Sequence, residues 1–308
     1  MTMRERKRAY LAWMIVCVVW GTTYLANRVA LETLPVALLA GFRWTAAGLV
    51  MIAVLRAFGI GLPPRHTWGP IAITGFLMTV IGNGCLVWSQ RYVASGLAAV
   101  LVATVSFWTV GLEALLGGER LTRYTVAGLL TGFSGIVLLV WPALTIGDNT
   151  GRMFVLGVII LQIGSMAWAL GTSYTKHHSF GDTPLASTAL QMLISGVMLI
   201  IAGTVLGEWP HVAFSARSLT ALIYLSIFGS VIAYTAYVYA LKYLPISTVS
   251  LYAYVNPVIA VFLGTLLLSE PFSPRIVVAA ALVFLGIAIV RSAPKPRLVA
   301  PLSRKAVA

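Results

Sequence analysis

The sequence predicts an all-α membrane protein whose ten transmembrane helices form two inverted five-helix repeats. Three observations predict this fold: the composition, an internal repeat and the distribution of charge. The chain has 308 residues, of which 59% are apolar and 9% are charged, and its mean hydropathy is +0.94. A soluble domain carries about 25% charged residues. This chain has too little polar side chain to cover a soluble fold, so we expect its solvent to be lipid.

Apolar stretches of the right length for helical spans recur along the chain. A transmembrane helix needs about 20 mostly apolar residues, and an open sheet cannot satisfy its backbone in lipid. Turn-forming residues such as Pro35, Gly117-Gly118 and Pro245 separate the stretches. The predicted spans lie near residues 10–27, 36–56, 68–88, 95–116, 124–141, 153–175, 185–206, 218–240, 247–268 and 274–291.

Marker segments of the first half return in the second half at a nearly constant offset. The pairs are Gly21-Thr22-Thr23-Tyr24 with Gly171-Thr172-Ser173-Tyr174, Arg91-Tyr92 with Lys242-Tyr243, Glu119-Arg120-Leu121 with Glu270-Pro271-Phe272, and Gly135-Ile136 with Gly286-Ile287. A duplicated hydrophobic unit is typical of secondary transporters, whose halves enclose a site between them. Each unit has an odd number of spans, so the second must be inverted.

The basic residues predict the orientation of the chain and its place in the cell. The net charge of +13 is concentrated beside the predicted spans, especially at the two chain ends. This pattern indicates contact with an anionic leaflet rather than with nucleic acid. With the N-terminus inside, most Lys and Arg lie on the cytoplasmic side. We therefore expect a multi-pass protein of the inner (plasma) membrane with both termini in the cytoplasm.

These observations divide the chain into five parts. They are a basic cytoplasmic N-terminus (1–9), a first repeat (10–141), a linker (142–152), a second repeat (153–291) and a basic cytoplasmic tail (292–308).

The order of motifs resembles a known family of transporters. The first half carries Trp20-Gly21-Thr22-Thr23-Tyr24, then Arg91-Tyr92-Val93-Ala94-Ser95-Gly96, a long apolar helix and Gly117-Gly118-Glu119-Arg120-Leu121; the second carries Lys242-Tyr243-Leu244-Pro245, Asn256-Pro257 and Ser269-Glu270-Pro271. Over nearly the whole chain this order resembles the EamA-type branch of the drug/metabolite transporter superfamily. The resemblance implies a ten-helix transporter, most often a metabolite or amino-acid exporter.

The chain departs from the family pattern at one position. Family members often carry a proline midway through the fourth helix, where this chain has Ser106. We therefore expect a proline kink only in the second half, at Pro257. A proline inside a helix removes one backbone donor, which makes Pro257 a candidate hinge for gating; the alternative is a structural bend without a role in transport.

Polar and aromatic side chains occur at the middle depth of several predicted spans. Polar groups at this depth avoid lipid, and they mark either a lumen or a contact between helices. Helical spacing places several of them on common faces. The candidate substrate-binding residues are Trp20, Asn83, Ser106, Trp108, Trp168, Tyr234, Tyr237 and Asn256.

Two ionisable residues fall inside predicted spans. Arg43 in the second span could meet a substrate carboxylate, or its side chain could extend outward to the membrane surface. Glu113 is the only carboxylate within a predicted span, and it is therefore the candidate side-chain proton relay.

The sequence predicts a transporter rather than an enzyme. It contains no nucleophile motif, phosphate loop or metal-ligand cluster, so we expect no catalysis, cofactor or metal. Its aromatic-rich spans suit small amphipathic metabolites such as amino acids, moved by alternating access. Two alternatives remain: a proton-coupled drug or cation extruder, and, less favoured, a non-transporting membrane enzyme or assembly factor. The bilayer and a small substrate are the expected partners, and a homodimer is left open.

Overall fold

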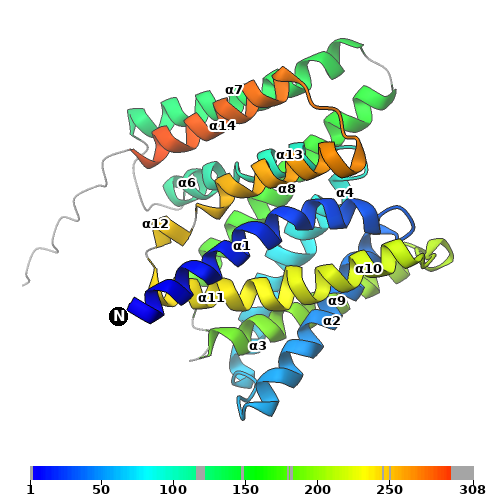
Figure 1. The fold of residues 1–308 in the computed structure, drawn as a ribbon, viewed down its shortest axis with the longest axis vertical. Coiled ribbons are helices and arrows are strands. Elements are labelled where there is room, and N and C mark those ends of the chain that lie inside the picture. Colours follow the sequence, from blue (N-terminus) through cyan, green and yellow to red (C-terminus); the bar gives the residue numbers. More distant parts are fainter. Residues whose placement is uncertain are drawn as a thin grey trace, which may run out of the picture.

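A computed structural model of the protein describes residues 3–115, 122–146, 149–178, 180, 183–244, 246–249 and 251–292, without the side chains of 113–114, 143–146, 176–177 and 246–247. All regular structure within these residues is helical. Most helices run roughly parallel or antiparallel, as a bundle (Figure 1). The predicted all-α fold is confirmed.

The first half of the bundle contains five spans. Its elements are α1 (Met3–Ala30), α2 (Val36–Ala57), η1 (Arg65–Thr67), α3 (Trp68–Gly75), η2 (Phe76–Asn83), α4 (Gly84–Ser89), α5 (Ser95–Val102), α6 (Val105–Leu115) and α7 (Arg123–Ile146). Here α3, η2 and α4 form one continuous span, and α5 and α6 together form another.

The second half repeats this arrangement. Its elements are α8 (Asn149–His177), α9 (Pro184–Val205), η3 (Trp209–His211), α10 (Ala216–Tyr224), η4 (Leu225–Ile232), α11 (Ala233–Tyr243), α12 (Ile246–Val249), α13 (Tyr252–Leu268) and α14 (Pro274–Arg291). Among the described residues, nine helical stretches are long and apolar enough to cross a membrane, and Tyr252–Leu268 is a shorter apolar helix. That shorter helix belongs to the predicted ninth span.

Several helices are longer than the sequence predicts. Helix α1 begins at Met3, so the basic residues expected to precede the first span continue the same helix. Helix α7 runs to Ile146 and α8 begins at Asn149, so much of the predicted linker is helical. Apolar periodicity locates the part of a helix inside lipid, but the helix itself continues for as long as its backbone bonds are satisfied.

The third and eighth spans each contain a π-helical segment of eight residues, η2 and η4. The wider π turn leaves backbone carbonyls without their usual partner, and such segments occur frequently at functional sites. The two segments occupy corresponding positions in the two repeats. The sequence analysis did not predict them, because apolar patterning does not distinguish π from α turns.

The fourth and ninth spans are both interrupted, although only the ninth contains a proline. Thr104 separates α5 from α6, and its hydroxyl donates to the carbonyl of Leu101 at 2.6 Å. The neighbouring backbone bonds are tight i to i−3 bonds, such as Thr104 N to Leu101 O at 3.2 Å. A threonine hydroxyl that competes for a helix carbonyl explains this break without a proline. In the ninth span the interruption precedes Pro257, which lies inside α13.

Corresponding helices of the two repeats pair with each other. Helix α2 packs along α9, and α7 packs along α14; the α7–α14 pair forms one edge of the bundle in Figure 1. Small residues permit close contact, since a Cβ at Gly286 would lie 2.5 Å from the Gly128 carbonyl oxygen and one at Gly196 would lie 2.3 Å from the Thr45 nitrogen.

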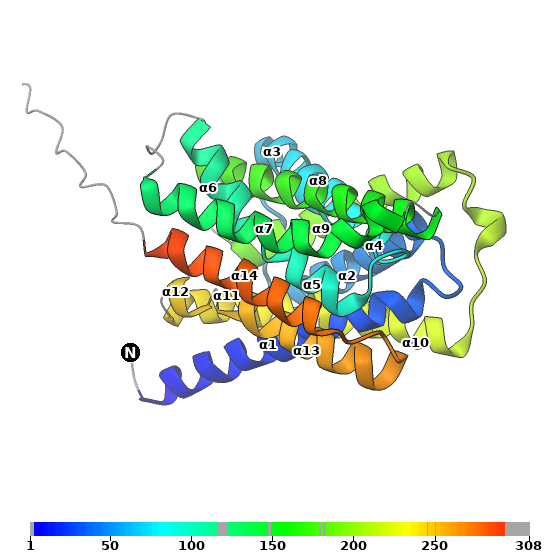
Figure 2. The same cartoon turned by 90° about the horizontal axis from the view of Figure 1, so that it is seen from above.

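The remaining long helices cross between the repeats. Helix α1 of the first repeat packs against α10, α11 and α13 of the second, whereas α8 of the second packs against η2, α4 and α6 of the first. Figure 2 places the beginning of α1 and the end of α14 at the same end of the bundle. This crossed packing makes the interface between the repeats the centre of the molecule.

Candidate substrate cavity

A cavity of about 240 Å³ lies at the interface between the two repeats. Its lining residues come from α1, α2, η2, α4, α5 and α6 of the first repeat and from α8, α11, α13 and the end of α14 of the second. The lining residues are Trp20, Thr23, Tyr24, Asn27, Arg43, Trp44, Gly82, Asn83, Leu86, Ala99, Val102, Ala103, Val105, Ser106, Leu161, Gly164, Ser165, Trp168, Tyr234, Tyr252, Ala253, Asn256 and Arg291.

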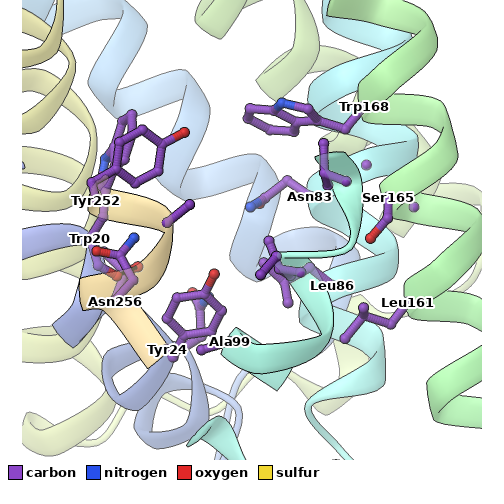
Figure 3. A pocket seen from close by; sticks show the side chains of 18 of the residues that line it. Trp20, Tyr24, Asn83, Leu86, Ala99, Leu161, Ser165, Trp168, Tyr252 and Asn256 are labelled. Carbon is purple, nitrogen blue, oxygen red and sulfur yellow. Dashed lines mark hydrogen bonds between the residues drawn. The ribbon is translucent and has the colours of Figure 1, made fainter. Parts of the chain in front are cut away.

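The crossed packing of α1 and α8 produces two opposed walls. Figure 3 shows Trp20, Tyr252 and Asn256 on one side of the cavity, facing Trp168 and Ser165 of α8 on the other. Because α1 packs on the second repeat and α8 on the first, each wall combines residues from both repeats. The cavity is therefore lined jointly by the two repeats.

Trp20 occupies a fixed position in the first wall. Its indole N–H donates to the carbonyl of Gly229 in the π-helical segment η4, at 3.2 Å. Its ring packs edge-on against Tyr234 and Tyr252, with centroids 5.2 and 4.9 Å away. Edge-to-face contacts stabilise aromatic pairs beyond their apolar burial. The cavity thus has a rigid aromatic surface against which an apolar group can pack.

Trp44 and Asn83 form a second fixed pair. The Trp44 indole N–H donates to Asn83 Oδ1 at 3.0 Å, and both residues are largely buried. Asn83 is the last residue of η2 and lines the cavity, whereas η4 contacts a lining residue through the bond from Trp20 to the Gly229 carbonyl. The bond uses the amide oxygen of Asn83 and leaves its NH₂ group as a donor.

Arg43 is buried in the wall and does not extend to the membrane surface. Its side chain is 4% exposed. The guanidinium donates from Nε to Ser230 Oγ at 3.1 Å and from Nη1 to Asn27 Oδ1 at 3.5 Å. It also lies 4.5 Å from the centroid of the Trp44 ring, a cation–π distance. The sequence left two positions open for Arg43, and the structure places it at the cavity.

Asn256 connects α13 to α1. With its amide nitrogen facing the nearest acceptors, Asn256 donates to the carbonyls of Cys17 and Tyr252 at 3.0 Å each. These two bonds fix the contact between the helices and use the amide nitrogen of Asn256, so its amide oxygen points away from both carbonyls. Pro257 follows Asn256 inside α13 but does not line the cavity. Ala253 does line it, and the proline leaves the carbonyl of Ala253 without its usual backbone donor.

Polar contacts close the bundle beyond Tyr24 and Asn27. Gln90 donates to the carbonyl of Tyr24 at 2.9 Å, and Arg28 donates to the carbonyl of Gln90. At the same end of the bundle, the Glu270 carboxylate accepts from the Ser95 backbone N–H and hydroxyl, at 2.9 and 2.8 Å. A carboxylate at a helix N-terminus satisfies orphan N–H groups and complements the helix dipole. The cavity is therefore closed at this end and extends toward Arg291 at the other.

The structure brings together six of the eight predicted substrate-binding residues. Trp20, Asn83, Ser106, Trp168, Tyr234 and Asn256 all line the cavity. Tyr237 does not line it but packs behind the wall, 5.3 Å from the Trp20 ring. The side chain of Glu113, on α6, lies outside the described part of the chain.

Trp108 lies elsewhere, which corrects its predicted position. Its indole N–H donates to Gln162 Oε1 at 2.9 Å, and its ring packs against Phe133. It lines a second cavity of about 450 Å³, with Ile136, Val137, Val140, Val155, Val158, Ile159, Gln162, Ile163 and Met166. Ser106 and Trp108 lie in the same helix, α6, and residues two positions apart point to nearly opposite faces, so proximity to Ser106 in sequence does not bring Trp108 to this cavity.

Several wall residues were missed by the sequence analysis. Thr23, Asn27, Trp44 and Ser165 line the cavity but were not among the candidate residues. Thr23 and Asn27 share a helix face with Trp20, and Ser165 shares one with Trp168, so helical spacing would have found these three; Trp44, adjacent to Arg43, is not found in this way. Tyr252 shares a helix face with Asn256 in the same way.

Comparisons with known proteins agree with this architecture. The model of the EamA-like transporter family matches residues 7–141 and again residues 155–292. The chain is 35% identical over 274 residues to YedA, an uncharacterised inner membrane transporter of Escherichia coli, covering 89% of this chain and 87% of YedA.

More distant relatives and a solved structure extend the similarity. The chain is 24% identical over 299 residues to the transporter YvbV of Bacillus subtilis, covering 97% of this chain and 96% of YvbV. A crystal structure with 23% identity superposes with a TM-score of 0.64, covering 92% of this chain and 96% of the other, and supports the fold alone. On the evidence of two successive family matches and a relative above 30% identity, the chain belongs to the EamA-like transporter family.

Proposed function

We propose that this protein exports small amphipathic metabolites, such as amino acids with apolar or aromatic side chains, across the inner (plasma) membrane by alternating access. The observation that carries the proposal is the cavity with aromatic walls between the two repeats. Secondary transporters place their substrate site at such an interface and expose it to each side in turn as the repeats move. Export rather than uptake rests on the resemblance to EamA-type exporters.

The size of the cavity favours metabolites over drugs. Pockets for drug-sized ligands usually enclose about 300–1,000 Å³, and this cavity encloses about 240 Å³. The described lining side chains include no carboxylate. A proton-coupled cation extruder needs an acid in the path, and the side chain of its candidate, Glu113, lies outside the described part of the chain.

The proposed orientation places both termini in the cytoplasm. Positive charge near the chain ends supports it, because Lys and Arg are retained on the cytoplasmic side. The closed end near Glu270 would then face outward and the cavity would extend toward the cytoplasm. A compartment-sensitive reporter fused to the C-terminus should be active in the cytoplasm; activity on the other side of the membrane would refute this orientation.

The transport proposal is tested by removing one residue from each wall. Asn256→Ala and Trp168→Ala should each lower amino-acid flux in reconstituted vesicles by about tenfold, the effect of losing about 1.4 kcal/mol of substrate interaction. Trp108→Ala, which removes a tryptophan outside this cavity, is the matched control for Trp168→Ala and should retain parental flux. Flux equal to the parent in both cavity variants, at matched expression, would contradict the site assignment.

A further inference from the structure

Arg43 is a buried cation without an anionic partner among the described residues. Its two side-chain hydrogen bonds go to the neutral oxygens of Ser230 and Asn27. These bonds use two of the five guanidinium N–H groups, and the other three have no acceptor within the described part of the chain. Buried charges in proteins are normally paired, because an isolated charge in a medium of low dielectric is costly.

The surroundings of Arg43 orient the guanidinium rather than neutralise it. Ser230 belongs to the π-helical segment η4, and its own hydroxyl donates to the carbonyl of Leu225 at 3.1 Å. Asn27 holds Nη1 from α1, and the Trp44 ring lies against the guanidinium. The guanidinium of Arg43 is held in a fixed orientation, but its charge is not balanced by an anion, so it is arranged to bind one. A planar carboxylate matches the geometry of its N–H groups.

A second donor lies next to this fork. Trp44 contacts Arg43 through its ring face and Asn83 through its indole N–H. The Asn83 NH₂ group has no acceptor among the described residues and lines the same cavity. Two N–H donors therefore adjoin the Trp44 indole, with Arg43 over its ring face and Asn83 at its N–H edge. The other lining cation, Arg291, lies at the end of α14 over the Tyr254 ring.

We infer that Arg43 binds the carboxylate of the transported molecule and that a positively charged amino group is not required for binding. This inference rests on the proposed transport function and names the substrate class as small aryl or alkyl carboxylates. The aromatic wall of Trp20, Tyr234 and Tyr252 accommodates the apolar part of the molecule. The ammonium group of an amino acid meets no carboxylate in the described lining, so its removal should not weaken binding.

Four ligands that share a phenyl ring test this inference on the unmodified protein. They are 3-phenylpropionate (an anion), phenylalanine (a zwitterion), 3-phenylpropanamide (neutral) and phenethylamine (a cation). A ligand that binds the folded state raises the melting temperature by mass action. The anion should raise it at least as much as phenylalanine, and the amide and amine should leave it unchanged. Binding rather than flux is measured for these ligands, because the protonated form of 3-phenylpropionate crosses a bilayer without a transporter.

Variants of Arg43 separate charge from geometry. Arg43→Gln should abolish the melting shift with 3-phenylpropionate and reduce phenylalanine counterflow by about tenfold or more, by analogy with the loss of a buried charged partner. Arg43→Lys keeps the charge but not the bidentate fork, so it should retain part of the shift. Arg152→Gln removes an exposed arginine of α8 outside the cavity and should behave as the parent.

Two outcomes would overturn the inference while leaving the transport function intact. One is a melting shift with the amide or the amine equal to that with the anion. The other is parental phenylalanine counterflow through Arg43→Gln. If Arg43→Gln does not fold, the four-ligand comparison on the unmodified protein decides alone. Failure of the transport proposal would look different. The parent protein would then transport no metabolite, even if some of the four ligands raised its melting temperature.

Discussion

Two cavities in the described part of the molecule border the same helices, α6 and α8, but differ in chemistry. The cavity between the repeats is smaller, and its wall carries Arg43, Asn83 and Asn256 among aromatic rings. The other cavity, about 450 Å³, is lined almost entirely by aliphatic side chains, with Gln162 and Trp108 as its polar members. Volume alone would select the second cavity. The comparison teaches that a binding site in lipid is identified by convergent polar groups with fixed orientation.

Helix α8 presents a different face to each of the two cavities. Ser165 and Trp168 face the cavity between the repeats, whereas Ile159, Gln162 and Ile163 line the aliphatic one. Within each set the residues are spaced by one, three or four positions, so each set lies on its own face of α8. The second cavity fits lipid contact, since its lining offers lipid chains an apolar surface.

Filling each cavity from the same helix gives the strongest test of the comparison. Ser165→Trp places a large ring in the cavity between the repeats and should reduce flux by more than about tenfold, because the ring occupies the substrate volume and overpacks a close-packed wall. Ile159→Trp adds a similar ring to the aliphatic cavity and should leave flux near the parental value. Counterflow in proteoliposomes measures both. Equal losses in the two variants would remove the functional distinction between the cavities.

A smaller effect should come from the polar contact in the aliphatic cavity. Gln162 Oε1 accepts from the Trp108 indole N–H at 2.9 Å, and the Thr104 hydroxyl oxygen lies 2.9 Å from the same atom. Gln162→Leu removes this acceptor and should destabilise the protein by about 1 kcal/mol, the usual value of an interhelical hydrogen bond in a membrane, without changing flux per folded molecule. Thermal unfolding in detergent measures the loss, with Ile159→Leu as a control that keeps the bond. A specific loss of transport would assign this cavity a role in function.

The smallest effect is expected outside both cavities. Arg217 and Glu32 form a surface ion pair with a distance of 3.1 Å, and their side chains are 59% and 43% exposed. Exposed pairs contribute about 0–1 kcal/mol. Arg217→Ala should therefore leave the melting temperature and flux within error of the parent. A clear change in flux would mean that the closed end of the bundle depends on this pair.

The helical spans and many of the cavity residues follow from the sequence because each rests on local rules. Long apolar stretches must become helices in lipid, and repeated markers predict two copies of one unit. Polar residues such as Asn83 and Asn256 avoid lipid and therefore turn inward. These inferences need only composition and helical spacing, which are properties of short segments.

The positions of Trp108, Trp44 and Arg43 required the tertiary structure. A break at Thr104 without a proline, and two π-helical segments, change which face each helix presents. The crossing of α1 and α8 then decides which faces meet across the cavity. The sequence by itself determined the helical class, the duplication and the inward preference of polar groups. Only packing decided which of those groups share one cavity, because the direction of a side chain depends on helix phase and on contacts between residues far apart in the chain.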